Sequence, residues 1–290
     1  MSIPKEILVK KLRKFVEEDV GSGDITTFCT VPAEVTVEGD VVAKEKGVIA
    51  GLDEAGVLAE AFGLQVKALV KEGSSVSAKT CILHVWGDAA AMLAIERTLL
   101  NLLSRMSGIA THTRRLVEQI RAAGYRTIVA ATRKTVPGMA FFDKKAVMVG
   151  GGDSHRTGLD DMVLIKDNHV AIVGSVKEAV EKARKKASFS KKIEVEVSTA
   201  NDALEAAEAH ADIVMMDNFT PEQAREAIDL LKRKKLRAGV LVELSGGISE
   251  QNVLKYAAVG VDIVSLGEIT QNAKSLDMSL EVTKVKKLRS

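Results

Sequence analysis

Five basic residues in the middle of the chain are of types suited to binding anions. Each follows a short apolar run or a glycine-rich segment, where a strand or a turn is expected to end. They are Arg133, Lys134, His155, Arg156 and Lys166. Arginine binds a carboxylate or a phosphate through two parallel hydrogen bonds, and lysine binds one as a compact charge. These residues predict a site for an anionic substrate.

Carboxylates and glycine-rich turns follow the later apolar runs. Glu196 and Asp217 form an acidic pair suited to a hard divalent ion such as Mg²⁺, held partly through water. Ser245 and Gly246 open one turn and Gly267 opens another. Backbone N–H groups in such turns bind phosphate. The residue types together predict phosphate or diphosphate chemistry with an anionic co-substrate and Mg²⁺.

Six strand-like apolar runs would position these residues. They span 127–132, 162–166, 192–197, 212–217, 240–244 and 261–266. Helical periodicity separates most of them, at 176–186, 200–210, 221–234 and 250–258. Strands that alternate with helices predict a parallel sheet, and active sites of such folds form at the carboxyl ends of the strands. A complete or partial (β/α) barrel and a doubly wound open sheet are both compatible with this pattern.

The first hundred residues have a different organisation, that of an α+β unit. Helices are expected at 3–20 and 53–62, and strands around 35–43, 64–70 and 81–86, with Gly39 as a bulge. A long helix at 88–106 follows, with an apolar arc beside a polar stripe that includes Arg97 and Arg105. The tail at 276–285 alternates again and is expected to return to this first unit. Gly150–Gly152 is a candidate lid loop.

Composition limits the classes of partner. The 290 residues are 46% hydrophobic and carry a net charge of +2, and only 3% are aromatic, so nucleic acid is not expected as a partner. The sequence has no apolar run of the ~20 residues that cross a bilayer, and no secretory signal is evident, so no membrane association is expected. Cys29 and Cys81 are the two cysteines, which favours a reducing, cytoplasmic location.

A series of motifs along nearly the whole chain resembles the quinolinate phosphoribosyltransferase family, the decarboxylating nicotinate-nucleotide pyrophosphorylases. The motifs are EDVGSGDITT (18–27), ERTLLNLLSRMSGIAT (96–111), TRKTVPG (132–138), GGGDSHR (150–156), LIKDNHV (164–170), EVEV (194–197), MDNF (216–219), ELSGGIS (243–249) and LDMSLEV (276–282). The resemblance implies a type II phosphoribosyltransferase fold with an N-terminal α/β sandwich domain at 1–111, joined by the tail at 273–290. An incomplete (β/α) barrel at 112–272 would be the catalytic domain.

The resemblance also implies an activity and residue roles. Quinolinate and phosphoribosyl pyrophosphate, with Mg²⁺, would give nicotinate mononucleotide, diphosphate and CO₂ for NAD synthesis. Arg133, His155, Arg156 and Lys166 would surround the two carboxylates of quinolinate, and Arg97 would reach the site of a neighbouring subunit in a homodimer or a hexamer built from dimers. Lys134 would contact phosphoribosyl pyrophosphate, Glu196 and Asp217 would face its ribose and the metal, and its 5′-phosphate would lie at Ser245, Gly246 and Gly267.

Two departures from the family pattern leave the substrate preference open. Ala140 stands where the family often has an arginine, and 268–271 replaces a segment that commonly contains a histidine. The nearest alternative is therefore a phosphoribosyltransferase for nicotinate or a related base. A barrel lyase that uses Lys166 as a Schiff base, and a binding module without activity, are the remaining alternatives.

Overall fold

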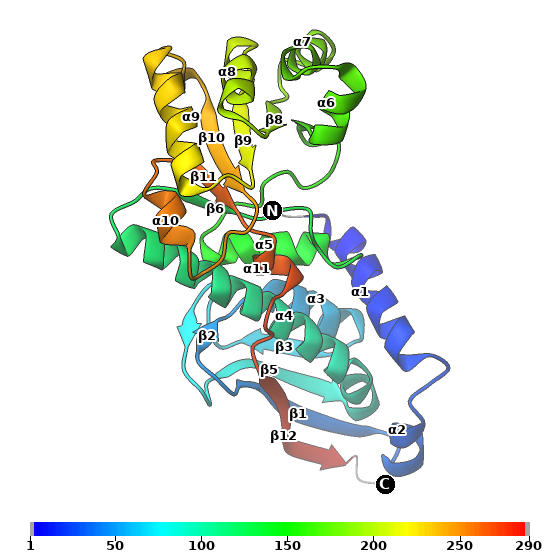
Figure 1. Ribbon diagram of the computed structural model, residues 1–290. Coiled ribbons are helices and arrows are strands. Elements are labelled where there is room, and N and C mark those ends of the chain that lie inside the picture. Colours follow the sequence, from blue (N-terminus) through cyan, green and yellow to red (C-terminus); the bar gives the residue numbers. More distant parts are fainter. Residues whose placement is uncertain (1–2, 288–290) are drawn as a thin grey trace. The chain divides into compact units, whose positions relative to one another are not determined.

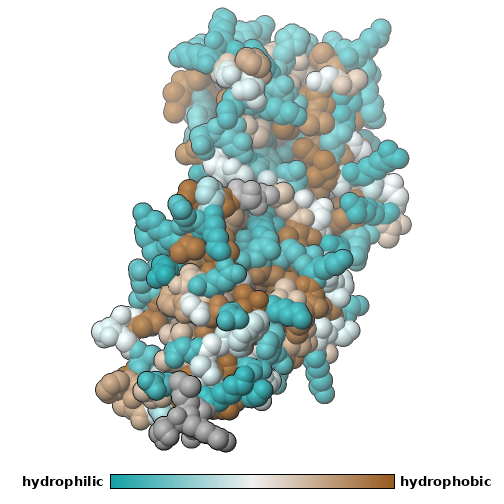
Figure 2. Space-filling model, turned by 180° about the vertical axis from the view of Figure 1, so that it is seen from behind, coloured by the Kyte–Doolittle hydropathy of each residue, from teal (hydrophilic) through white to brown (hydrophobic). Residues whose placement is uncertain are grey.

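The computed structural model describes residues 3–287, which form two compact units (Figure 1). The first unit contains the chain up to His112 together with the segment from Ala273 onward. The second unit is Thr113–Asn272. Figure 2 shows hydrophilic residues over much of the visible face of each unit, with hydrophobic residues scattered among them. Among the described helices, none combines the length and the apolar composition that crossing a membrane requires.

The first unit is built on an antiparallel sheet in the order β12-β1-β5-β3. The strands are β1 (Val35–Ala43), β3 (Gln65–Ala68), β5 (Cys81–Asp88) and β12 (Met278–Lys287), and a short ribbon joins β2 (Gly47–Val48) to β4 (Ser75–Val76). Register shifts between Glu38 and Gly39, which confirms the expected bulge. The tail does return to this unit, as β12 beside β1. The helices are α1 (Lys5–Val20), α2 (Ile25–Thr30) and α3 (Leu52–Ala61), of which α2 was not predicted.

Helix α4 (Ala89–Ala122) is much longer than the predicted helix at 88–106. The predicted apolar arc is buried, at Met92, Ile95, Leu99, Leu102, Leu103 and Met106. The helix continues through Gly108. The backbone of Lys274 passes so close to this position that a Cβ there would collide with it. This glycine therefore permits a close approach of two backbones and does not end the helix.

The second unit contains a six-stranded sheet in which every pair of neighbours is parallel. Its order is β6-β11-β10-β9-β8-β7, with β6 (Ile128–Ala130), β7 (Val163–Ile165), β8 (Ile193–Val197), β9 (Ile213–Asp217), β10 (Leu241–Ser245) and β11 (Ile263–Ser265). The order is a cyclic permutation of the chain order, as in a barrel, and has no switch point of the kind that defines a doubly wound sheet. β6 and β7 are not paired with each other, so the barrel is incomplete.

Helices connect these strands, and three of them begin at a residue whose side chain caps the helix. They are α5 (Ala140–Gly150), α6 (Asp167–Val173), α7 (Val176–Lys186), α8 (Ala200–Glu208), α9 (Pro221–Arg233), α10 (Val253–Ala257) and α11 (Glu268–Gln271), with a 3₁₀ turn η1 at Arg237–Gly239. Thr220 and Gln223 form a reciprocal capping box at the start of α9, and Pro221 occupies the first turn. Such local signals explain why α7, α8 and α9 lie close to their predicted bounds.

Candidate active site

The alternation of side chains along the short parallel strands determines what faces the barrel interior. Residues two apart on a strand share a face, so Glu194 and Glu196 of β8 project to the same side, as do Glu243 and Ser245 of β10. Strand register then places Ser245 beside Asp217 of β9. Polar side chains from neighbouring strands therefore meet inside the barrel near the carboxyl ends of the strands.

A cavity of about 330 Å³ lies at these carboxyl ends. Its lining includes the sequence-predicted residues Arg133, Lys134, His155, Arg156, Lys166, Glu196, Asp217 and Ser245. The size and the few convergent polar groups are typical of small-molecule sites. Gly246 and Gly267 adjoin members of this set, whereas Arg97 is exposed on α4 in the first unit and does not line the cavity.

Arg133 and Lys134 lie shortly after β6, which ends at Ala130, and Lys134 is held through its backbone. The Lys134 N–H donates to Oγ1 of Thr132 at 3.1 Å, and the Lys134 carbonyl accepts a hydrogen bond from Oγ1 of Thr270 at 2.7 Å. A Cβ built on Gly267 would lie 2.8 Å from Cδ of Lys134. The absence of a side chain at Gly267 therefore leaves room for the aliphatic part of Lys134.

Arg156 is buried, although it carries a guanidinium group. Burial lowers its pKa, and the positive charge of Arg133 lowers it further. Two arginines that repel each other beside one cavity form an environment in which a bound anion is favourable. The segment that carries Arg156 is joined to the barrel because Asp153 makes a parallel bridge with Ala130 of β6.

The opposite part of the cavity is acidic. Glu196 Oε2 lies 2.8 Å from Nζ of Lys166, and Asp217 Oδ2 accepts a hydrogen bond of 2.6 Å from Nδ2 of Asn218. Asn218 has a left-handed backbone, with φ 57°, and Gly246 has φ 92°. A Cβ on Gly246 would collide with the Asn218 side chain, so glycine is required at this turn.

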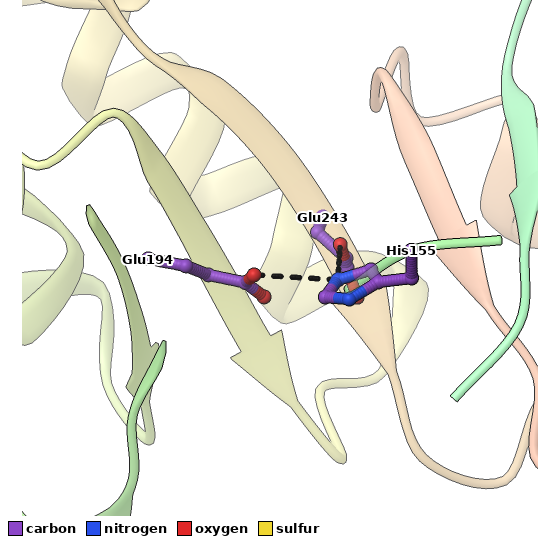
Figure 3. A group of neighbouring side chains, drawn as sticks. All are labelled: His155, Glu194 and Glu243. Atoms are coloured by element: carbon purple, nitrogen blue, oxygen red, sulfur yellow. Dashed lines mark hydrogen bonds and ion pairs between the residues drawn. The ribbon is translucent and has the colours of Figure 1, made fainter. Parts of the chain in front are cut away.

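His155 lies between two fully buried carboxylates, those of Glu194 and Glu243 (Figure 3). Nε2 of His155 is 3.3 Å from Glu194 Oε2 and 3.2 Å from Glu243 Oε2, and Nδ1 accepts the backbone N–H of Arg156 at 2.8 Å. Burial lowers the pKa of His155, whereas the two carboxylates raise it. Burial raises the pKa of Glu194. A doubly protonated ring would carry a proton on Nδ1 and could not accept the Arg156 N–H, so in this arrangement the ring carries its proton on Nε2, and the raised pKa of Glu194 favours a further proton of the cluster on that carboxyl.

Glu194 and Glu243 were not among the predicted site residues, although they lie near the ends of the predicted strands at 192–197 and 240–244. The available signal was the spacing, since Glu194 is two residues before Glu196 and Glu243 is two before Ser245.

Lys144 is a second buried basic residue that was not predicted. It belongs to α5, and its Nζ donates to the carbonyl of Ser154 at 2.5 Å. Burial lowers its pKa to about 8, although Asp153 opposes this shift. Lys144 therefore helps to hold the segment that leads to His155 and Arg156.

Glu196 and Asp217 line the same cavity, and two such carboxylates would suit a Mg²⁺ ion bound together with phosphate groups. Magnesium keeps several waters and binds through one or two carboxylates together with substrate phosphates, which two carboxylates on one cavity wall can satisfy. Across residues 3–287, the group of three ligand-type side chains that lie close enough for one ion is His155, Glu194 and Glu243. That group is unsuited to a metal, because Nε2 carries the proton while Nδ1 accepts an N–H.

Comparisons with known proteins cover nearly the whole chain. Residues 24–107 match the family model for the N-terminal domain of quinolinate phosphoribosyl transferase, and residues 109–281 match the model for its C-terminal domain. A probable nicotinate-nucleotide pyrophosphorylase [carboxylating] of Methanothermobacter thermautotrophicus is 45% identical over 275 residues, which covers 95% of this chain and 99% of the relative. A protein of Methanocaldococcus jannaschii with the same name is 46% identical, with 97% and 99% covered.

A solved structure agrees with these relatives. The nicotinate-nucleotide pyrophosphorylase from Francisella tularensis superimposes with a TM-score of 0.88 at 35% identity, and the match covers 97% of this chain and 98% of that one. The two family models, the relatives that match over nearly their whole length and the solved structure all point to the family that the motifs resemble. The chain belongs to the quinolinate phosphoribosyltransferase family.

Proposed function

We propose that the protein transfers the phosphoribosyl group of phosphoribosyl pyrophosphate to quinolinate, giving nicotinate mononucleotide, diphosphate and CO₂ in de novo NAD biosynthesis. The observation that carries this proposal is one cavity lined by four cations, Arg133, Lys134, Arg156 and Lys166, and by the carboxylates Glu196 and Asp217. The relatives named nicotinate-nucleotide pyrophosphorylase [carboxylating] support the same reaction.

The cationic wall suits the two adjacent carboxylates of quinolinate. Arg133 and Arg156 would each bind a carboxylate, and Lys166 would add a third positive charge. Ala140 removes one cation from the segment after Arg133, but the four that line the cavity remain. A substrate with one carboxylate would neutralise less of this charge. The cavity therefore favours quinolinate over nicotinate.

The remaining residues suit phosphoribosyl pyrophosphate. Lys134 would contact the diphosphate, and Glu196 and Asp217 would face the ribose hydroxyls and the ion. Ser245, with the backbone N–H groups of Gly246 and Gly267, would hold the 5′-phosphate. Lys134 lies against Gly267, so groups for both ends of the sugar phosphate are close together.

Ligand binding would also change partners inside the site. Lys166 is paired with Glu196 at 2.8 Å, and this contact joins the residues proposed for the two substrates. Quinolinate would draw the ammonium group of Lys166 away, and the ribose would replace it at Glu196. An ion-paired ammonium is also a poor nucleophile, which argues against the Schiff-base lyase alternative.

The reaction then needs charge stabilisation and no enzyme nucleophile. The pyridine nitrogen would form a bond to ribose C1 while the bond from C1 to the diphosphate oxygen breaks, with Lys134 neutralising the leaving oxygens. Magnesium, when bound with the diphosphate, would supply further neutralisation there. The quaternised ring would next accept the electron pair of the broken bond to the 2-carboxylate, CO₂ would leave, and C2 would take up a proton.

The active enzyme is proposed to be a homodimer, or a hexamer built from dimers, in which Arg97 of one subunit completes the site of its neighbour. Arg97 belongs to the unit that does not contain the cavity. Its side chain is exposed, so it is accessible to another subunit. This assignment has its support in the family motif at 96–111.

The direct test follows both products with quinolinate labelled in the 2-carboxylate. The purified protein, with phosphoribosyl pyrophosphate and Mg²⁺, is expected to release labelled CO₂ and nicotinate mononucleotide in equal amounts. Lys134→Ala is expected to abolish both. Nucleotide formation from nicotinate with none from quinolinate would overturn the proposal in favour of the alternative substrate.

A further inference from the structure

The imidazole of His155 lines the substrate cavity, yet both its nitrogens are used within the protein. Nε2 faces Glu194 and Glu243, and Nδ1 accepts the N–H of Arg156 at 2.8 Å. No ring nitrogen is thus left to donate to a carboxylate of the substrate. In this arrangement the ring contacts the backbone of the next residue, the buried arginine proposed to bind quinolinate.

The two carboxylates are costly features of a barrel core. Glu194 and Glu243 have no solvent exposure, and one oxygen of each approaches Nε2 of His155, whereas Oε1 of each has no hydrogen-bond partner among the described residues. Apolar side chains of similar volume would fill the same space without this desolvation cost. Packing therefore does not account for them, and their common feature is the approach to Nε2 of His155.

The segment from Asp153 to Arg156 needs to be held, because its backbone is unusual. His155 has φ 51°, in the left-handed region that residues other than glycine seldom adopt. Asp153 and Ser154 are tied at the start of the segment, through the bridge to Ala130 and through Lys144. The His155 ring makes the contact at its end, directly beside Arg156.

We propose that Glu194 and Glu243 are positioning residues, which hold the His155 ring so that its Nδ1 fixes the backbone, and thereby the guanidinium, of Arg156 at the quinolinate site. This inference rests on the proposed function, since it assigns Arg156 to quinolinate. His155 contributes to substrate binding through Arg156, and the carboxylates contribute through His155.

The test compares the KM for quinolinate with that for phosphoribosyl pyrophosphate in Glu243→Leu. The KM for quinolinate is expected to rise at least about tenfold, the effect of a lost or displaced charged contact, while the KM for phosphoribosyl pyrophosphate stays within about twofold. Glu243→Gln retains an oxygen that accepts the Nε2 proton, so its quinolinate KM is expected to lie much closer to wild type. Glu194→Leu is expected to act in the same direction as Glu243→Leu.

A matched control separates positioning from general destabilisation. Val242 is fully buried and precedes Glu243 on β10, so its side chain points to the other face of the strand. Val242→Ala is expected to lower stability and to leave the quinolinate KM unchanged. If Val242→Ala raised the quinolinate KM as much as Glu243→Leu does, the specific role would be refuted.

A double-mutant cycle tests whether the carboxylate acts through the ring. In a His155→Ala background, Glu243→Leu is expected to add less than about twofold to the quinolinate KM, because coupled residues are not additive. If the effects of His155→Ala and Glu243→Leu on the quinolinate KM multiplied, the proposal would be contradicted. It would also be contradicted if the purified protein contained one divalent metal ion per site and Glu243→Leu removed that ion. A wild-type protein inactive on quinolinate would refute the proposed function itself, whereas normal wild-type activity with an unchanged KM in Glu243→Leu would refute this inference alone.

Discussion

At the scale of single residues, the adjacent pair Arg133 and Lys134 shows how one strand end can serve two anions. Lys134 lies against Gly267, on the side proposed for the sugar phosphate. Arg133 lies close enough to Arg156 for its charge to lower the pKa of that buried guanidinium. The two neighbours both line the cavity and are proposed to bind different anions there.

Replacing Arg133 with alanine tests the quinolinate side of this division. Arg133→Ala is expected to lower kcat/KM for quinolinate about 100-fold or more, as loss of a bidentate charged contact does. The KM for phosphoribosyl pyrophosphate should change little. Arg225 is exposed on α9 and does not line the cavity, so Arg225→Ala serves as the control with normal kinetics. Near-normal kcat/KM in Arg133→Ala would remove Arg133 from the site.

Lys144 gives the stability of the protein a specific pH dependence. Its pKa is about 8 in the folded protein and 10.5 in its ordinary state, so between these values the unfolded chain binds the additional proton. Its contribution to stability is therefore fully present above pH 10.5 and is lost as the pH falls through about 8.

Lys144→Met isolates this contribution. The difference in free energy of unfolding between wild type and Lys144→Met is expected to change in favour of wild type by up to ~1.4 kcal/mol per pH unit between pH 8 and 10.5. Urea unfolding curves of both proteins across this interval measure the difference. A difference independent of pH would show that the Lys144 ammonium is not destabilised by burial.

At the scale of elements, apolar periodicity and helix-capping residues predicted the six strands of the barrel and the helices α7, α8 and α9 well, whereas α6 and α11 were not predicted. α7 lies at its predicted bounds, and α8 and α9 differ only at their ends, since caps and apolar spacing act locally. α5 was missed because its buried side contains Asp143 and Lys144 as well as Phe142, so no amphipathic pattern is visible. The length of α4 was underestimated. The reason for a glycine at position 108 is the close approach of the Lys274 backbone, and such a contact between residues far apart in sequence is not visible in a local pattern.

The expectation of a lid at Gly150–Gly152 is not supported by the packing of these residues. Gly150 ends α5, and its carbonyl accepts a hydrogen bond from Nε of Arg114 at 2.9 Å. A Cβ on Gly152 would lie 2.8 Å from the carbonyl oxygen of Val129. These glycines permit close packing against β6. The site residues at strand ends could be found from sequence, but buried contacts such as Glu243 with His155 depend on register between strands.

A substitution at Gly267 tests whether the missing side chain at this position makes room for Lys134. A methyl group there would press on Cδ of Lys134, so Gly267→Ala is expected to lower kcat/KM for phosphoribosyl pyrophosphate about tenfold while the protein remains folded. Gly239 has open space around a built Cβ, so Gly239→Ala is the matched control with unchanged kinetics. Equal kinetics in both variants would contradict the proposed placement of Lys134.

At the scale of the whole molecule, the barrel unit supplies the cavity and the other unit carries Arg97. The cyclic strand order brings residues from six strands and their loops to one site. The first unit is built on antiparallel strands closed by the tail, and the described residues that line the cavity belong to the barrel unit. The function proposed for Arg97 is that of a residue shared between subunits.

Hybrid oligomers of two inactive variants test whether Arg97 acts in the site of a neighbouring subunit. Arg97→Ala and Lys134→Ala homomers are each expected to be nearly inactive, while hybrids of the two should regain activity, because one site in each hybrid dimer would have both residues intact. Activity after unfolding and refolding the two variants together measures this. Hybrids that stay inactive, although they form, would show that Arg97 does not act in a partner's site.

The central claim is that this cavity selects a pyridine with two carboxylates. The most direct measurement is the ratio of kcat/KM for quinolinate to that for nicotinate, with phosphoribosyl pyrophosphate and Mg²⁺ saturating. The cluster of cations predicts a ratio of about 100 or more, since the site would lose one charge-assisted contact with nicotinate. A ratio near or below one would contradict the account and would mean that Ala140 and 268–271 mark a different substrate.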